Sequence, residues 1–285
     1  MYDKRRKYYL VLDCETATLP YVNELAPEHR QTVAIAKPLV YDLGWKVIDR
    51  KGNVYARKNY LITEIFSVPH IFNTAYYASK RPIYLDKLRK KEIILADWQT
   101  ATDELEKDLK ACNCVGAYNS MFDFKKAIPF TEEYISALYS ANYQEWEKEQ
   151  KKKIDFIIAH PQYENKKSFN GKVFSFRNND YELFDLWGLS CKHLLDNDDF
   201  RQFCADNNYH TSSKKFFSTT AETSYRFLMN DTEFIESHTA IDDVDIETEI
   251  FKKIIEKTKN KYEKGIIYFP FRIVGRYDFF VGEIE

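Results

Sequence analysis

The chain has 285 residues, of which 44% are hydrophobic and 30% charged, a composition typical of soluble globular proteins. Its formal net charge of −2 argues against a protein that coats nucleic acid indiscriminately. It does not exclude a nuclease, because bound cations offset catalytic acids locally. No run of about 18 apolar residues is present, so we expect no membrane span and no membrane partner.

The cysteines and the N-terminus both indicate a reducing, cytoplasmic location. Cysteine occurs five times without a CxxC pair or a zinc-binding spacing, so free thiols in a reducing compartment are expected. The basic start "MYDKRRK" precedes an apolar run of only about six residues, which is too short for a signal peptide.

The first half of the chain predicts an alternation of strands and helices. "YYLVLDCE" (8–15) is a compact apolar run typical of a central, doubly covered strand. Residues 39–49 and 53–65 flank the turn signal "RKGN" and predict a hairpin. Residues 97–110 predict a helix that begins at a capping residue, and "CVGAYNS" (114–120) predicts a short strand that leads into the helix "MFDFKKAI".

The second half predicts an interruption followed by late helices. Residues 143–180 are charged, polar and turn-rich, and we interpret them as an insertion or small subdomain; a solvated excursion is favoured over a substrate-contacting arm. Another apolar run covers 181–195, and helices are expected at 219–231 and 239–260. The order predicts a mixed α/β fold with the first strand central. We expect one domain, 1–285, with an unassigned C-terminal extension at 261–285.

Two segments place acids near the ends of predicted elements. Asp13 and Glu15 are two residues apart on the first strand, so they share a face at its C-terminal end, where open α/β sheets commonly bind ligands. Solvent exposure at a strand end is the equally ordinary alternative. Asp123 opens a helix four residues after Asn119; taken alone, its position favours simple stabilisation of the helix dipole.

In the last predicted helix, an acid falls on the apolar side. At about 100° per residue, Asp243 is nearly in line with Ile250 and Ile254, and a buried carboxylate without a partner is costly. Glu247 falls within the same inward arc; it either supports the site or pairs with a basic neighbour, and we favour the pair. His238 is expected in the loop just before this helix.

Acids from distant segments, together with one histidine, suit a particular chemistry. Hard divalent cations take oxygen ligands, and two such ions about 4 Å apart can clamp the attacking and leaving oxygens in phosphoryl transfer. Histidine can accept a proton from water near neutral pH. Close carboxylates repel one another unless cations lie between them.

Three motifs resemble those of the DEDDh branch of the 3′–5′ exonucleases. "DCET" from Asp13 resembles the first motif, DxE. "NSMFD", Asn119 to Asp123, resembles the second, NxxFD, and "HTAIDD", His238 to Asp243, resembles the third in its histidine form. The branch includes the proofreading subunit of bacterial DNA polymerase III and RNase T. The resemblance covers roughly 8–63, 97–130 and 215–260 and looks most like bacterial or phage-encoded members, so a bacterial or phage-infected cytoplasm is expected.

The resemblance implies an RNase H-like fold with a mixed five-stranded sheet flanked by helices. It implies that Asp13, Glu15, Asp123 and Asp243 hold two Mg²⁺ or Mn²⁺ ions, and that His238 is the general base for hydrolysis that releases nucleoside 5′-monophosphates from 3′ ends. The resemblance also suggests which residues contact or support the substrate, namely Thr16, Leu19, Asn119 and Phe122. Two departures are visible: "ATLP" replaces the glycine common after DxET, and Tyr118 stands where the family often has histidine.

Several alternatives remain at this stage. We favour a metal-dependent exonuclease acting on single-stranded DNA. An exoribonuclease or oligonucleotide-trimming enzyme would use the same site, and no residue reads a ribose 2′-hydroxyl unambiguously. A non-catalytic nucleic-acid-binding module on the same fold would not need all four acids and His238. A polymerase or replication partner is conceivable from the family, but no docking signal is visible in the sequence.

Overall fold

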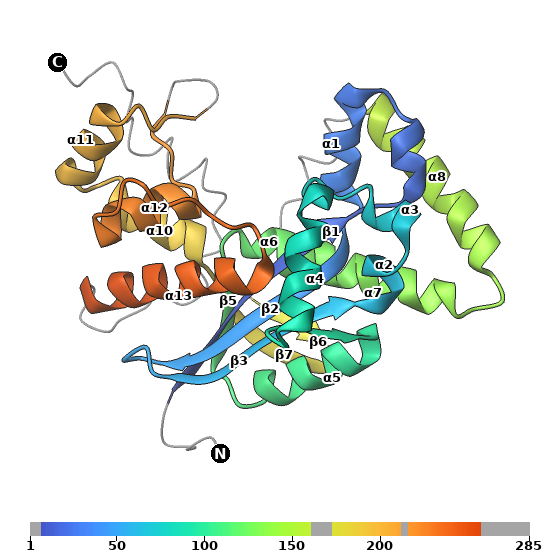
Figure 1. Ribbon diagram of the computed structural model, residues 1–285, viewed down its shortest axis with the longest axis horizontal. Helices are drawn as coiled ribbons and strands as arrows, with labels where there is room; N and C mark the ends of the chain where they lie inside the picture. The colour runs from blue at the N-terminus through green and yellow to red at the C-terminus, as the bar shows by residue number, and fades with distance from the viewer. Residues whose placement is uncertain (1–6, 161–172, 212–215, 258–285) are drawn as a thin grey trace.

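The protein is built on a seven-stranded mixed sheet flanked by helices (Figure 1). The computed structural model describes residues 7–160, 173–211 and 216–257. The strand order is β4-β3-β2-β1-β5-β7-β6, and β2 and β6 run antiparallel to the other strands. The strands are β1 Tyr8–Ala17, β2 Leu39–Asp49, β3 Val54–Ile62, β4 Ile94–Ala96, β5 Cys114–Ala117, β6 Val173–Phe176 and β7 Asn179–Asp185.

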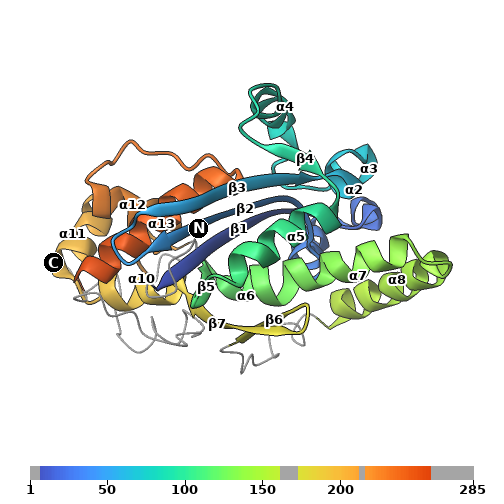
Figure 2. The ribbon, with the colours of Figure 1, turned by 90° about the horizontal axis from the view of Figure 1, so that it is seen from below.

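Helices cover both faces of the sheet (Figure 2). Helix α13 packs on β1 and β2 together with α10 and α12, whereas α5 and α7 lie on the opposite face against β3 and β2. The α-helices are α1 Pro27–Ala36, α2 Thr63–Phe66, α3 Pro69–Phe72, α4 Arg81–Arg89, α5 Trp98–Leu109, α6 Ser120–Phe122, α7 Ile128–Leu138, α8 Tyr143–Ala159, α10 Leu186–Leu194, α11 Asp198–Asp206, α12 Ala221–Met229 and α13 Ala240–Lys257. Two 3₁₀ turns, Pro20–Glu24 and Ala78–Lys80, and a π-helical turn, Asp123–Ala127, complete the described elements.

The side-chain alternation of β1 decides which face carries the acids. Leu10 and Leu12 belong to the large core under α5 and α7, whereas Tyr9 and Val11 belong to the core under α13. Because side chains of a strand alternate between faces, the odd-numbered positions continue the α13 face beyond Val11. Asp13 and Glu15, which follow Val11 at odd positions, are therefore directed toward α13.

The N-terminus of α13 lies directly against β2 at Gly44. A side chain at Gly44 would place its Cβ 2.8 Å from the backbone of Ala240 and of Ile241, so only glycine fits there. Two residues earlier on β2, the buried carboxylate of Asp42 accepts a hydrogen bond from Ala240 N–H at 2.9 Å. This bond satisfies one of the free N–H groups at the start of a helix and places negative charge at the positive end of its dipole.

A second buried aspartate fixes the turn between β5 and α6. Asn119 adopts a left-handed backbone conformation with φ of 75°, which asparagine tolerates better than most residues. The Asp185 carboxylate, at the end of β7, accepts hydrogen bonds from Ser120 N–H at 2.9 Å and from Gly188 N–H at 2.6 Å. Asp185 thus joins the start of α6 to the start of α10 and fixes the approach to Asp123.

Most of the expected elements are confirmed, and the expected number of strands is wrong. The central first strand, the hairpin and the helices at 97–110, 219–231 and 239–260 are present within a few residues. The sheet has seven strands instead of five because β4 pairs with β3 at one edge and β6 pairs with β7 at the other. β4 has only three residues, none of them buried, and β6 lies in the polar segment that we had interpreted as an insertion.

Two segments, 143–180 and 261–285, were expected to be an insertion and a C-terminal extension. Residues 143–180 contribute α8 and β6 and the beginning of β7 to the described structure, while the extension at 261–285 lies outside the described residues. The five cysteines all lie within the described residues, and none of them forms a disulfide, as expected. None of the helices in the described ranges combines the length and apolar character that crossing a bilayer requires.

The contact between Gly44 and α13 predicts the effect of one added methyl group. Gly44→Ala would push the backbone of Ala240 away from β2, and we expect a loss of about 1–3 kcal/mol in the free energy of unfolding, as for other overpacked cores. Urea unfolding followed by far-ultraviolet circular dichroism measures this change. An unchanged unfolding midpoint would contradict the close contact.

Candidate metal centre

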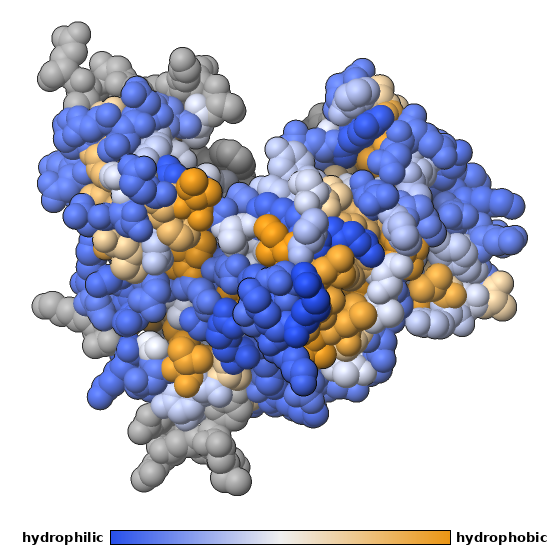
Figure 3. Space-filling view, in the orientation of Figure 1, coloured by the Kyte–Doolittle hydropathy of each residue, from blue (hydrophilic) through white to orange (hydrophobic). Residues whose placement is uncertain are grey.

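Acids predicted from two distant segments of the sequence line one cavity. The cavity has a volume of about 300 Å³ and is lined by Asp13, Glu15, Tyr118, Trp187, Thr220, Ala221, Glu236, His238, Asp243 and Glu247. Figure 3 shows a hollow between the part of the molecule that contains α10 to α12 and the part that contains α1, α3 and α8. The elements that line the cavity converge near the base of this hollow. The structure therefore brings residues 13, 15, 238 and 243 together.

The pairing of β1 with β2 becomes irregular directly after the two acids of β1. Asp13 pairs with Gly44 across the β1–β2 ladder, and the register shifts between Glu15 and Thr16. A bulge of this kind redirects the side chains beside it and is common next to functional sites. Asp13 and Glu15 are half-buried on the face of the sheet that α13 covers.

Asp123 joins the acids of β1 through the backbone between them. β5 pairs with β1 only from Tyr9 to Val11, and beyond this point Cys14 N–H donates a hydrogen bond to Asp123 Oδ1 at 3.2 Å. The Asp123 side chain is 2% exposed and begins a π-helical turn, a rare geometry that is frequent at functional sites. A role confined to the helix dipole does not account for this burial near Asp13.

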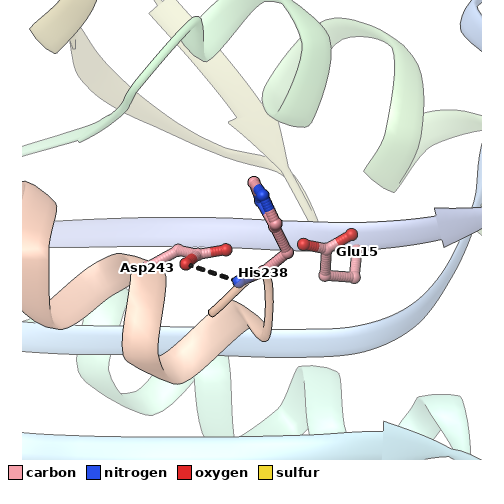
Figure 4. A group of neighbouring side chains, drawn as sticks. All are labelled: Glu15, His238 and Asp243. Carbon is pink, nitrogen blue, oxygen red and sulfur yellow. Dashed lines mark hydrogen bonds between the residues drawn. The ribbon is translucent and has the colours of Figure 1, made fainter. Parts of the chain in front are cut away.

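Asp243 and His238 are held together by a backbone hydrogen bond (Figure 4). His238 N–H donates to Asp243 Oδ1 at 3.2 Å, and His238 has a left-handed backbone with φ of 52°. Such strained conformations cluster at functional sites. One ligand atom each from Glu15, His238 and Asp243 lies within 4.8 Å of the others. The inward orientation predicted for Asp243 is confirmed, since the residue is 4% exposed.

Burial and mutual repulsion raise the pKa values of these acids. Loss of solvent is the largest cause at each of them, followed by neighbouring negative charge. The pKa of Asp13 rises to about 8 through burial and the charges of Glu236 and Asp42. The pKa of Asp243 rises to about 9 through burial and the charges of Asp13 and Glu236. The pKa values of Glu15 and Asp123 are also raised well above their ordinary range.

His238 has an environment that keeps its imidazole neutral. Burial and the neighbouring positive charge of Lys80 lower its pKa. Its ring stacks on Tyr77 with centroids 4.4 Å apart, and its Nδ1 lies 3.8 Å from a carboxylate oxygen of Glu236. Lys80 Nζ in turn lies 4.4 Å from the centroid of the Tyr77 ring and donates to Ser237 O. A neutral, oriented imidazole is the form that accepts a proton.

Several residues of the site were not singled out from the sequence. Four further residues position the site residues or contact them, namely Asp42, Tyr77, Asp185 and Glu236. Of these, Asp42 interrupts the apolar run "LVYDLGW", and this interruption is the sequence signal for a buried acid.

The expectation that Glu247 pairs with a basic neighbour is wrong within the described residues. Its carboxylate is 3% exposed and accepts a hydrogen bond from Tyr118 N–H at 3.4 Å.

The four residues expected to contact or support the substrate have different environments. Thr16 is half-buried beside the bulge, and Asn119 is exposed at the start of α6. Leu19 is 5% exposed within the main core, and Phe122 packs partly buried against it. Thr16 and Asn119 therefore keep surface for a ligand, whereas Leu19 and Phe122 mainly support the backbone near the site.

The donor set of this cavity fits divalent metal ions. Carboxylate oxygens are the ligands that Mg²⁺ and Mn²⁺ favour. Within the described chain no cationic side chain forms an ion pair with Asp13, Glu15, Asp123 or Asp243, although Lys80 lies near enough to lower the pKa of Glu15. These four carboxylates are the residues that would hold the ions.

The raised pKa values predict how stability depends on pH without metal. In the unfolded chain Asp243 loses its proton near pH 4, whereas in the folded chain it holds the proton up to about pH 9. The folded state binds more protons between these values, so the free energy of unfolding should fall as pH rises from about 4 to 9. Urea unfolding in EDTA across this range measures the slope.

Asp243→Asn should flatten this slope and raise stability near pH 8, because an amide does not have to take up a proton when the chain folds. The matched control is Asp245→Asn on the same helix. Asp245 pairs with Lys46 at 2.7 Å and with Arg57 at 2.8 Å, so this change should lower stability. If Asp243→Asn lost as much stability as Asp245→Asn, Asp243 would instead be a structural pairing partner.

Comparison with family models and with curated proteins identifies no relative of this chain. No family model matches the chain, and no curated protein matches it significantly. A functional assignment therefore depends on the side chains of the cavity and their geometry.

Proposed function

We propose that this protein is a metal-dependent 3′–5′ exonuclease that releases nucleoside 5′-monophosphates from single-stranded DNA ends. The observation that carries the proposal is the convergence of Asp13, Glu15, Asp123, Asp243 and His238 at the end of β1. These residues come from three segments of the sequence, and each one is held by backbone contacts specific to this fold. They also match, in order, the three motifs of the DEDDh exonucleases.

The arrangement of the inner strands supports an RNase H-like fold. Without the short edge strands β4 and β6, the order is β3-β2-β1-β5-β7, and β2 alone runs antiparallel. This is the mixed five-stranded sheet that the motif resemblance implies. The proposal therefore treats β4 and β6 as additions at the two edges of that sheet.

The chemistry assigned to the residues follows from their surroundings. Two bound divalent cations, Mg²⁺ or Mn²⁺, would stabilise the negative charge that develops on the phosphate oxygens during hydrolysis. These ions would be held by Asp13 and Glu15 of β1 together with Asp123 and Asp243. His238, kept neutral by burial and Lys80, takes the proton from the attacking water at its imidazole, and Tyr77 and Glu236 restrict the orientation of its ring.

An exposed aromatic side chain beside the site supports an unpaired strand as substrate. Tyr76 is 89% exposed, and its ring lies 4.8 Å from that of Tyr77, the residue that stacks on His238. Exposed aromatic rings stack on bases of single strands without regard to sequence, whereas the bases of a duplex are already stacked. Lys80 adds positive charge on the same side of the site.

Release of mononucleotides from a labelled single strand tests the proposal. We expect shortening from the 3′ end with Mg²⁺ or Mn²⁺ and none with EDTA. A panel of DNA and RNA, single- and double-stranded, decides between the DNA exonuclease and an exoribonuclease with the same site. A protein that binds the strand but never shortens it with any divalent metal would instead be a binding module.

The same assay examines the proton acceptor. His238→Ala should lower the rate by about 10²–10⁴-fold, the range usual for loss of a general base, and should leave Mn²⁺ binding intact. His70→Ala, which changes an exposed histidine outside the cavity, serves as the control and should keep full activity. Near-normal activity of His238→Ala would remove this residue as the base.

Substitution of Tyr76 examines the contact with the strand. Stacking contributes about 1–3 kcal/mol per base, so Tyr76→Ala should weaken binding of a single-stranded oligonucleotide about 5–150-fold. Fluorescence anisotropy with Ca²⁺ in place of Mg²⁺ measures this change. Tyr76→Phe should bind normally. Tyr139→Ala is the matched control, because Tyr139 is 73% exposed and does not line the cavity. Equal affinity of Tyr76→Ala and the control would contradict this contact.

A further inference from the structure

Glu247 is a carboxylate of the cavity that, like Glu236, lies outside the three motifs. It lies one helical turn after Asp243 on α13, so both side chains share a face of the helix. The residue is 3% exposed and lines the cavity together with Asp13 and Asp243. Its position is therefore that of a component of the site and not that of a surface acid.

The charges that act most strongly on Glu247 are those of other acids. Burial raises its pKa, and the negative charges of Asp13, Asp123 and Asp243 raise it further. Its bonded neighbour is the N–H of Tyr118, and within the described chain no ion pair joins it to a basic side chain. A carboxylate in such surroundings is expensive to retain unless a cation compensates it.

The hydrogen bond of Glu247 also connects two parts of the site. Tyr118 immediately precedes Asn119, the left-handed residue at the start of the turn that leads to Asp123. By accepting the Tyr118 N–H, Glu247 ties α13 to this turn. Asp243 and Asp123, which belong to those two elements, are thus held at a fixed separation.

We propose that Glu247 is a further carboxylate of the metal centre and that its charge would strengthen the binding of divalent cations there. This inference rests on the proposed function, since it concerns the same cations. Residues that orient or assist metal ligands typically change metal affinity by about 10–100-fold when they are replaced. Glu247 both adds negative charge near these cations and fixes the turn that carries Asp123.

Binding of Mn²⁺ to the full chain, measured by isothermal titration calorimetry, tests the inference independently of activity. Glu247→Gln keeps the size of the side chain and an oxygen that can accept the Tyr118 N–H, and it removes only the charge. We expect it to weaken at least one Mn²⁺ site about 10–100-fold and to raise the melting temperature without metal. The matched control is Glu249→Gln, because Glu249 lies on the same helix but pairs with Lys252 at 3.3 Å; its Mn²⁺ affinity should be unchanged.

The possible outcomes separate this inference from the proposed function. Wild-type affinity in a folded Glu247→Gln variant would overturn the inference and leave the exonuclease proposal standing. Absence of Mn²⁺ binding to the wild-type chain would overturn both. If Glu247→Gln melted well below the wild type without metal, Glu247 would be a structural residue and the inference would fail.

Discussion

The contact between the N-terminus of α13 and the middle of β2 determines the geometry of the whole site. Gly44 allows the helix backbone to approach the strand, and the buried carboxylate of Asp42 binds the first free N–H of the helix. His238 and Asp243 lie on either side of this anchor. Since Gly44 also pairs with Asp13, the strand that carries the first motif and the helix that carries the third are aligned through a single residue of β2. The position of His238 therefore depends on a glycine that does not itself line the cavity.

Backbone N–H groups donate hydrogen bonds to three of the acids without neutralising their charge. Cys14 donates to Asp123, His238 to Asp243 and Tyr118 to Glu247. A carboxylate has more acceptor positions than one such bond uses, so each acid keeps oxygen available for a cation. By contrast, the acids on the outer face of α13 are neutralised by side chains: Asp242 bonds Lys87 at 2.6 Å, and Asp245 pairs with Lys46 and Arg57. One helix therefore carries structural acids on one face and uncompensated acids on the other.

Sequence periodicity could predict the direction of Asp243 and of the acids on β1, because helical and strand repeats decide which face a side chain occupies. It could also predict the central strand, the hairpin and the late helices. It did not predict the edge strands, since β4 has three residues without a buried side chain. β6 has only four residues and lies in a polar segment, although its Phe174 and Phe176 are buried in the main core. The expected ion pair of Glu247 is wrong for a related reason. Periodicity predicts which face of a helix a side chain occupies, but the charges opposite that face belong to segments more than a hundred residues away.

The buried carboxylates lower the stability of the folded state without metal, and this loss of stability helps to decide whether the fold is only a binding platform. A platform would gain stability from apolar or ion-paired residues at positions 13, 123, 243 and 247, because buried carboxylates that raise one another's pKa destabilise the ionised folded state. Divalent cations reverse this balance, since the same charges then bind the metal and their repulsion is relieved. Strained His238 adds a further cost that an inert surface has no reason to retain. These costs support the proposed metal site over a binding platform. The acid cluster and the left-handed histidine are joined directly, since His238 N–H donates a hydrogen bond to Asp243.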